Sequence, residues 1–176
     1  KSNGGKAILT KDNHPSGSDR VYEAYTKELK SNVDLIINLQ GDMPNIKPNS
    51  ILKLEKLMKE NVCDIGTLAS PLKSSEIYNK NIVKVYTEKK LEKNGFLKAK
   101  DFIRESDEIH NLGFHNLERI YHHVGIYAFT KDALKKYVNL PRSKAEIKKN
   151  LEQLRALDNG MIIKVGLNDS SILGID

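Results

Sequence analysis

The stretch VDLIINLQGDMP, residues 33–44, places a carboxylate, Asp42, directly after an apolar run that is typical of a β-strand. The run is apolar on both faces, as in strands of parallel sheets that helices cover on each side. Ligands of open α/β sheets bind outside the carboxyl ends of the strands, so Asp42, released by Gly41, is placed to hold a metal ion or a substrate. An aspartate before a proline-containing turn also often caps a helix or binds its own backbone, and this alternative stays open.

A second polar segment, HPSGSDR at residues 14–20, places two serines and a glycine before an expected helix. The free N–H groups and the dipole of a helix N-terminus favour an anion such as a phosphate. Ser16 or Ser18 could equally serve as the N-cap of that helix. The adjacent His122 and His123 lie in an expected strand, where neighbours point to opposite faces, so at most one of them should enter a common pocket.

The elements that must position these residues alternate between strands and helices, which predicts a single α/β domain. Strands are expected at residues 7–10, 33–39, 64–70, 81–87, 120–130 and 161–167, and helices at about 19–30, 51–58, 130–138 and 143–160. The last helix should open on a capping box formed by Ser143 and Glu146. Residues 88–120 are charged and weakly periodic, and this pattern predicts an insertion or flap.

Composition narrows the class of protein. With 176 residues and 39% hydrophobic content, the chain can form one compact domain. It lacks an apolar run of transmembrane length and a signal-peptide core, so a cytoplasmic protein without a membrane partner is expected. The net charge of +6 comes from scattered lysines without interleaved aromatics, so no nucleic-acid partner is expected. Cys63 is the single cysteine, which excludes an internal disulfide and a multi-cysteine zinc site.

Four segments carry a resemblance to a known family, and they occur in the order HPSGSDR, NLQGDMP, HHVGIYAF and LEQLRAL. The chain resembles the cytidylyltransferases of 3-deoxy-manno-octulosonate (Kdo), also called CMP-Kdo synthetases. This resemblance implies a three-layer, Rossmann-like mixed sheet flanked by helices, of the nucleotide-diphospho-sugar-transferase type, with the first strand missing. It implies the reaction of CTP with Kdo to give CMP-Kdo and pyrophosphate for lipopolysaccharide biosynthesis, with Mg²⁺ as cofactor. It leaves a homodimer open.

The resemblance also assigns roles to individual residues. It assigns catalysis and magnesium binding to Asp42 and Asp176. It assigns contacts with the nucleotide to Ser16, Gly17 and Arg20, and contacts with the sugar acid to Gln40, Arg104, His123, Glu152 and Gln153. Without the resemblance, a histidine in a strand is more often a packing residue, and two polar residues on a helix can form a solvated face.

The edges of the chain and one internal segment depart from the family pattern. The family's opening strand and its basic triphosphate loop have no counterpart here, and the chain ends at Asp176, so we expect a partial domain that is truncated at both ends. Residues 105–119 do not match the family, which leaves their role open. Three functions stay open: a CMP-Kdo synthetase, a cytidylyltransferase for another acidic sugar, and a catalytically inactive remnant of such an enzyme or a non-catalytic binding protein.

Overall fold

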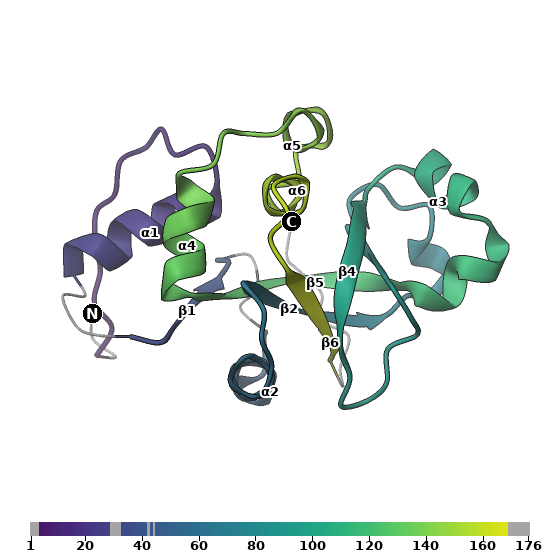
Figure 1. The fold of residues 1–176 in the computed structure, drawn as a ribbon, viewed down its shortest axis with the longest axis horizontal. Helices are drawn as coiled ribbons and strands as arrows, with labels where there is room; N and C mark the ends of the chain where they lie inside the picture. The colour runs from purple at the N-terminus through teal and green to yellow at the C-terminus, as the bar shows by residue number, and fades with distance from the viewer. Residues whose placement is uncertain (1–3, 29–32, 42, 44, 169–176) are drawn as a thin grey trace.

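The computed structural model describes residues 4–28, 33–41, 43 and 45–168. In this part of the chain, helices cover both faces of a six-stranded mixed sheet (Figure 1). The strands are β1 (Leu35–Leu39), β2 (Ile65–Pro71), β3 (Lys84–Thr87), β4 (Phe96–Ile103), β5 (Ile120–Thr130) and β6 (Ile163–Leu167). The helices are α1 (Gly17–Glu28), α2 (Pro48–Glu60), α3 (Ser106–Leu112), α4 (Lys131–Val138), α5 (Lys144–Lys149) and α6 (Gln153–Asp158), with 3₁₀-helices η1 (Ser74–Glu76) and η2 (Phe114–Arg119).

The long strand β5 organises the sheet, whose order is β1-β5-β2-β6-β4-β3. β5 pairs antiparallel with β1, β2 and β3, whereas β2 and β6 pair in parallel. These features confirm the expected mixed α/β sheet. The expectation of a parallel strand at residues 33–39 is wrong in the described part of the sheet, because β1 pairs antiparallel with β5. The expected cover on both faces is confirmed, since Ile36 belongs to one core cluster whereas Leu35 and Ile37 pack against the other.

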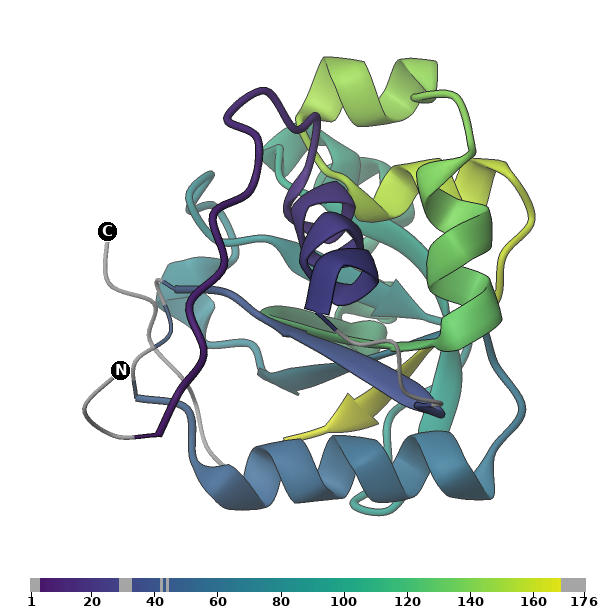
Figure 2. The ribbon, with the colours of Figure 1, turned by 90° about the vertical axis from the view of Figure 1, so that its left-hand side faces the viewer.

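Helices pack on the sheet in two layers. In Figure 2, α1 lies beside α4 on one face, and α2 crosses the opposite face. The apolar stripe of α2, which includes Leu54, Leu57 and Met58, is buried against β2 and β5. The sheet under α2 carries Gly166, where an added Cβ would lie 2.4 Å from Leu57 Cδ1. The glycine therefore allows helix and sheet to approach closely. None of the described helices is both long and apolar enough to cross a bilayer.

Three elements differ from the sequence-based expectation. Residues 7–10 form no strand; they run along α1, where Lys27 Nζ donates to Leu9 O at 3.2 Å, and Leu9 is 91% exposed. A short apolar run forms a strand only where a sheet edge receives it. The helix expected over 143–160 breaks into α5 and α6, because Asn150 adopts the left-handed conformation with φ 52°. The capping box of Ser143 and Glu146 is present as predicted.

The third difference concerns the predicted insertion or flap at residues 88–120. Residues 96–103 form β4, which pairs with both β3 and β6 and contributes the buried Phe102 and Ile103 to the core. The sequence pattern does not reveal this strand, because its buried residues Phe96, Ala99 and Phe102 are three positions apart instead of two. The pairing with β3 shifts register between Tyr86 and Thr87, which breaks the alternation. For residues 96–103 the expectation is corrected, whereas α3 and η2 follow β4 as a small helical layer at the end of the sheet (Figure 1).

Candidate active site

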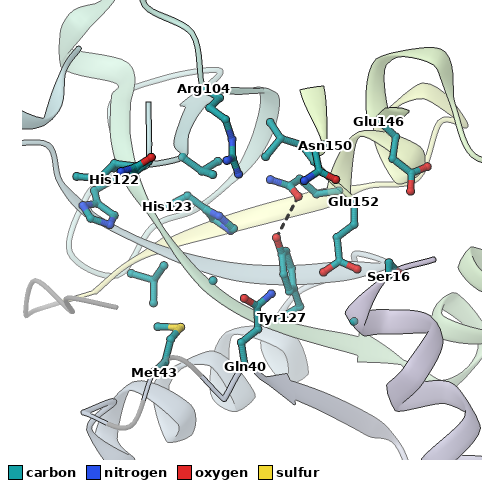
Figure 3. A pocket seen from close by; sticks show the side chains of 18 of the residues that line it. Ser16, Gln40, Met43, Arg104, His122, His123, Tyr127, Glu146, Asn150 and Glu152 are labelled. Atoms are coloured by element: carbon teal, nitrogen blue, oxygen red, sulfur yellow. Dashed lines mark hydrogen bonds between the residues drawn. The ribbon is translucent and has the colours of Figure 1, made fainter. Parts of the chain in front are cut away.

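A polar cavity of about 510 Å³ opens beside β5, where the start of α1, the residue after β1 and the start of α6 meet (Figure 3). The predicted site residues that line it are Ser16, Gly17, Gln40, Arg104, His123, Glu152 and Gln153. Residues as distant in the sequence as Ser16 and Gln153 are thus brought together, because each lies next to the end of an element or on β5 itself. Asp42 and Asp176 lie outside the described residues.

Arg20, which the resemblance assigns to the nucleotide, does not line the cavity. Its guanidinium donates to Thr10 Oγ1 at 2.7 Å and to Lys11 O at 2.8 Å. Glu23, one turn further along α1, accepts a hydrogen bond from Lys11 N at 3.1 Å. Side chains of α1 therefore hold the segment that leads into Pro15 and Ser16 at the cavity.

In the loop before α1, Ser16 both caps the helix and lines the cavity, which are the two roles that the sequence left open. Ser16 Oγ accepts a hydrogen bond from Asp19 N at 3.3 Å and donates to Asp19 Oδ2 at 2.6 Å, which is the behaviour of an N-cap residue. Ser16 also lines the cavity. Next to it, Ser18 N donates to Glu152 Oε2 at 3.1 Å, so the carboxylate of the residue before α6 accepts from one of the free N–H groups of α1.

His123 is a neutral imidazole in the floor of the cavity, with 7% of its surface exposed. Its burial, helped by the neighbouring His122, lowers its pKa to about 3. The single hydroxyl proton of Thr67 is donated to Ile126 O at 2.6 Å, so Thr67 Oγ1 accepts from His123 Nε2–H at 2.9 Å. The tautomer is thereby fixed, and Nδ1 of His123 is a hydrogen-bond acceptor.

His122 also lines the cavity, so the expectation that at most one of the two histidines would reach it is wrong. Its imidazole turns toward the rim, where Nδ1 lies 3.3 Å from Glu76 Oε1 of η1. The buried Glu76 holds the imidazole of His122 from outside the sheet. The wall of the cavity includes both His122 and His123. Alternation along a strand fixes the direction of the Cβ atoms but does not fix the extent of a cavity.

Tyr127 is a cavity residue that the sequence reasoning missed. It lies four residues after His123 on β5, and its hydroxyl donates to Gln153 Oε1 at 3.2 Å (Figure 3). The signal was available, because Tyr127 belongs to the HHVGIYAF segment and residues four apart share a strand face. Gln153 is 5% exposed, so it is not part of a solvated helix face. Its amide NH₂ group is left to donate to a ligand.

Arg104 supplies positive charge to the opposite wall of the cavity, and its side chain points inward (Figure 3). Its Nε is buried and donates to no atom of the described residues. The buried Lys84 lies near it and donates from Nζ to Asn79 O at 2.5 Å. Burial, followed by the charge of Arg104, lowers the pKa of Lys84. A half-buried arginine with a buried donor that has no described partner, beside another cation, is a site for a carboxylate or a phosphate.

The described residues contain no cluster of three or more histidine, cysteine, aspartate or glutamate side chains that could hold a metal ion. Gln40 and Met43, which flank Asp42 in the sequence, both line the cavity. The predicted magnesium ligands thus remain a prediction from the resemblance.

Comparison with known proteins identifies the family. The family model described as Cytidylyltransferase matches residues 1–164. This chain belongs to the cytidylyltransferase family. Within the family, the 3-deoxy-manno-octulosonate cytidylyltransferase of Thermodesulfovibrio yellowstonii is 44% identical over 184 residues, covering 100% of this chain and 71% of that protein. The enzyme of the same name from Bartonella bacilliformis is 38% identical, covering 98% of this chain and 69% of that protein.

A solved structure supports the same grouping at the level of the fold. The structure of CMP:2-keto-3-deoxy-manno-octonic acid synthetase complexed with CTP superposes with a TM-score of 0.83 at 33% identity. The match covers 99% of this cytidylyltransferase and 68% of that chain. The expected fold class and the expected family are therefore confirmed.

Proposed function

We propose that this cytidylyltransferase joins CMP to Kdo, with CTP as the nucleotide donor. The observation that carries the proposal is the cavity itself, in which the loop before α1 faces the polar residues of β5 and α6 across one continuous space. Nucleotidyl transfer needs both substrates in one place, because it depends on alignment and on charge stabilisation rather than on a covalent enzyme intermediate.

In the proposed reaction, the anomeric hydroxyl of the sugar acid attacks the α-phosphorus of CTP. A new O–P bond forms, the bond to the β-phosphate breaks, pyrophosphate leaves, and the proton of the hydroxyl is released to solvent. Arg104 binds the carboxylate of the sugar, because its buried Nε is a donor without a described partner. His123 accepts a hydrogen bond from a sugar hydroxyl at Nδ1, and Gln153 donates one from its amide.

On the nucleotide side, we assign Ser16 and Gly17 to CTP, because both lie at the cavity beside the start of α1. The assignment of magnesium to Asp42 and Asp176 stays a proposal from the family resemblance. Carboxylates supply the oxygen ligands that Mg²⁺ prefers, and such an ion neutralises charge on phosphate oxygens. We also propose that the protein is cytoplasmic, because CTP is made there. A homodimer is a further proposal, which size-exclusion chromatography with light scattering tests.

The test uses the protein at its natural length with CTP, Kdo and magnesium. Arg104→Gln should raise the KM for Kdo at least about tenfold and change the KM for CTP little, because the carboxylate of the sugar loses its cationic partner in the cavity. The matched control is Arg119→Gln, since Arg119 lies over the ring of Tyr86 and donates to Glu88 O, away from the cavity.

Pyrophosphate release and the mass of the product give the readout. Formation of CMP-Kdo by the wild type, with a KM change confined to Kdo in Arg104→Gln, supports the proposal. If an acidic sugar with a different carbon chain is turned over faster than Kdo, that sugar and not Kdo is the substrate. No pyrophosphate release with any sugar acid would refute the activity and favour an inactive remnant.

A further inference from the structure

Two residues of the family motifs, Asp19 and Arg155, lie behind the cavity and do not line it. Arg155 belongs to α6 and is 1% exposed. Its Nη1 donates to Asp19 Oδ2 of α1 at 3.2 Å, and its Nε and Nη2 donate to the two carboxylate oxygens of Glu146 at 3.0 and 2.7 Å. The guanidinium also lies 4.5 Å from the ring centroid of Tyr137 in α4. One side chain thus contacts three other helices.

The network around Arg155 stays charged inside the protein. Burial by itself would lower the pKa of Arg155, but the hydrogen bonds to Glu146 and the charge of Asp19 raise it. Burial would likewise raise the pKa of Glu146, but its hydrogen bonds with Arg155 and Arg142 lower it. The carboxylate of Glu146 accepts from four donors, so it is saturated even though it borders the cavity. Removing one member would leave a buried charge without its partner.

A second link joins the start of α1 to the start of α6. Ser18, next to Asp19, donates its backbone N–H to Glu152 Oε2 at 3.1 Å, and Glu152 precedes α6. Tyr137 Oη donates to Glu152 O at 3.0 Å, which ties this turn to α4 as well. The loop assigned to the nucleotide and the turn assigned to the sugar acid are therefore fastened by two bonds that span 134 and 136 residues of sequence.

We propose that Asp19 and Arg155 are positioning residues, which set the distance and angle between the nucleotide loop and the sugar-binding turn of α6. The inference rests on the proposed function, because it concerns the alignment of the two substrates. A residue that contacts one substrate changes mainly the binding of that substrate. A residue that fixes the relation between both changes mainly the rate of the chemical step, and a misplacement of about 1 Å can cost roughly a hundredfold.

The main variant is Asp19→Asn, which keeps the size of the side chain and removes its charge. The second variant is Arg155→Lys, which keeps the charge and leaves the Ser16 to Asp19 bonds in place but loses the forked contact with Glu146. The matched control is Glu55→Gln on α2, which removes a surface pair with Lys59 at 2.6 Å. The wild type, the two single variants, their double variant and the control are compared at natural length, at a temperature where unfolding curves show each to be folded.

Kinetics give the first readout. Each single variant should lose about ten- to hundredfold in kcat, with the KM values for CTP and Kdo within about threefold of the wild type. The double variant should cost no more than the worse single variant, because both residues act through one pair. The control Glu55→Gln should match the wild type.

Hydrogen exchange at the Ser18 amide, followed by NMR, gives a readout that does not depend on activity. The amide is held by Glu152, so its exchange should become faster in Asp19→Asn and in Arg155→Lys, and should not change in Glu55→Gln. Unchanged kcat in the folded variants, or a rise confined to the KM for CTP, would overturn the positioning role. Unchanged exchange at Ser18 would overturn the mechanical link. A wild type without pyrophosphate release refutes the proposed function instead, and the exchange rates then still decide the link.

Discussion

The buried, neutral state of His123 predicts how the stability of the protein depends on pH. Its pKa is about 3 in the folded protein, against an ordinary value of 6.5 that applies to the unfolded chain. Between these values the unfolded state binds a proton that the folded state does not bind. The stability is therefore fully present above about pH 6.5 and is lost as the pH falls toward about 3.

The size of the effect follows from the two pKa values. Each pH unit inside this window costs about 1.4 kcal/mol, so lowering the pH from about 7 to about 5 should remove about 2 kcal/mol through His123 alone. Other groups titrate in the same range, so the wild type is compared with His123→Gln, in which glutamine keeps a donor for Thr67 and cannot titrate. The variant should lose about 2 kcal/mol less than the wild type over this range.

Urea unfolding at the two pH values measures the free energies directly. Val85→Ala is the control, because Val85 is a buried, non-titrating residue of β3. It should lower stability at both pH values and keep the pH dependence of the wild type. Equal pH dependence in the wild type and in His123→Gln would refute the reasoning, since His123 would then titrate alike in the folded and unfolded states.

Three further predictions concern backbone and loop positions. Gly166→Ala should lower the free energy of unfolding by about 1–3 kcal/mol in urea titrations, because its Cβ would lie 2.4 Å from Leu57 Cδ1. Asn150→Ala should lose about 1 kcal/mol in the same titration while Asn150→Gly changes little, because φ is 52° at this residue; equal losses would contradict this. Arg20→Gln should speed limited proteolysis before α1, because the bond to Thr10 is lost; an unchanged cleavage rate would count against the anchoring role.

The sequence alone predicted the elements whose signals are local. The apolar stripe of α2, the aromatic and β-branched run of β5, and the capping box of Ser143 and Glu146 each depend on residues only a few positions apart. The four motif segments also predicted the family, and most of the residues that they nominated meet at one cavity. Local spacing was sufficient in these cases because helix and strand periodicities are properties of a short stretch of chain.

Only the tertiary structure decided the roles of residues whose partners are distant in sequence. The lysine-containing segment 96–103 is a strand of the sheet because it pairs with β3 and β6, and Arg20 holds the segment before α1. Asp19 and Arg155 are 136 residues apart in the sequence, yet they form a part-buried ion pair in which Arg155 is 1% exposed. Burial and pairing of a charge depend on which elements the fold packs together, and that depends on contacts that no local pattern encodes.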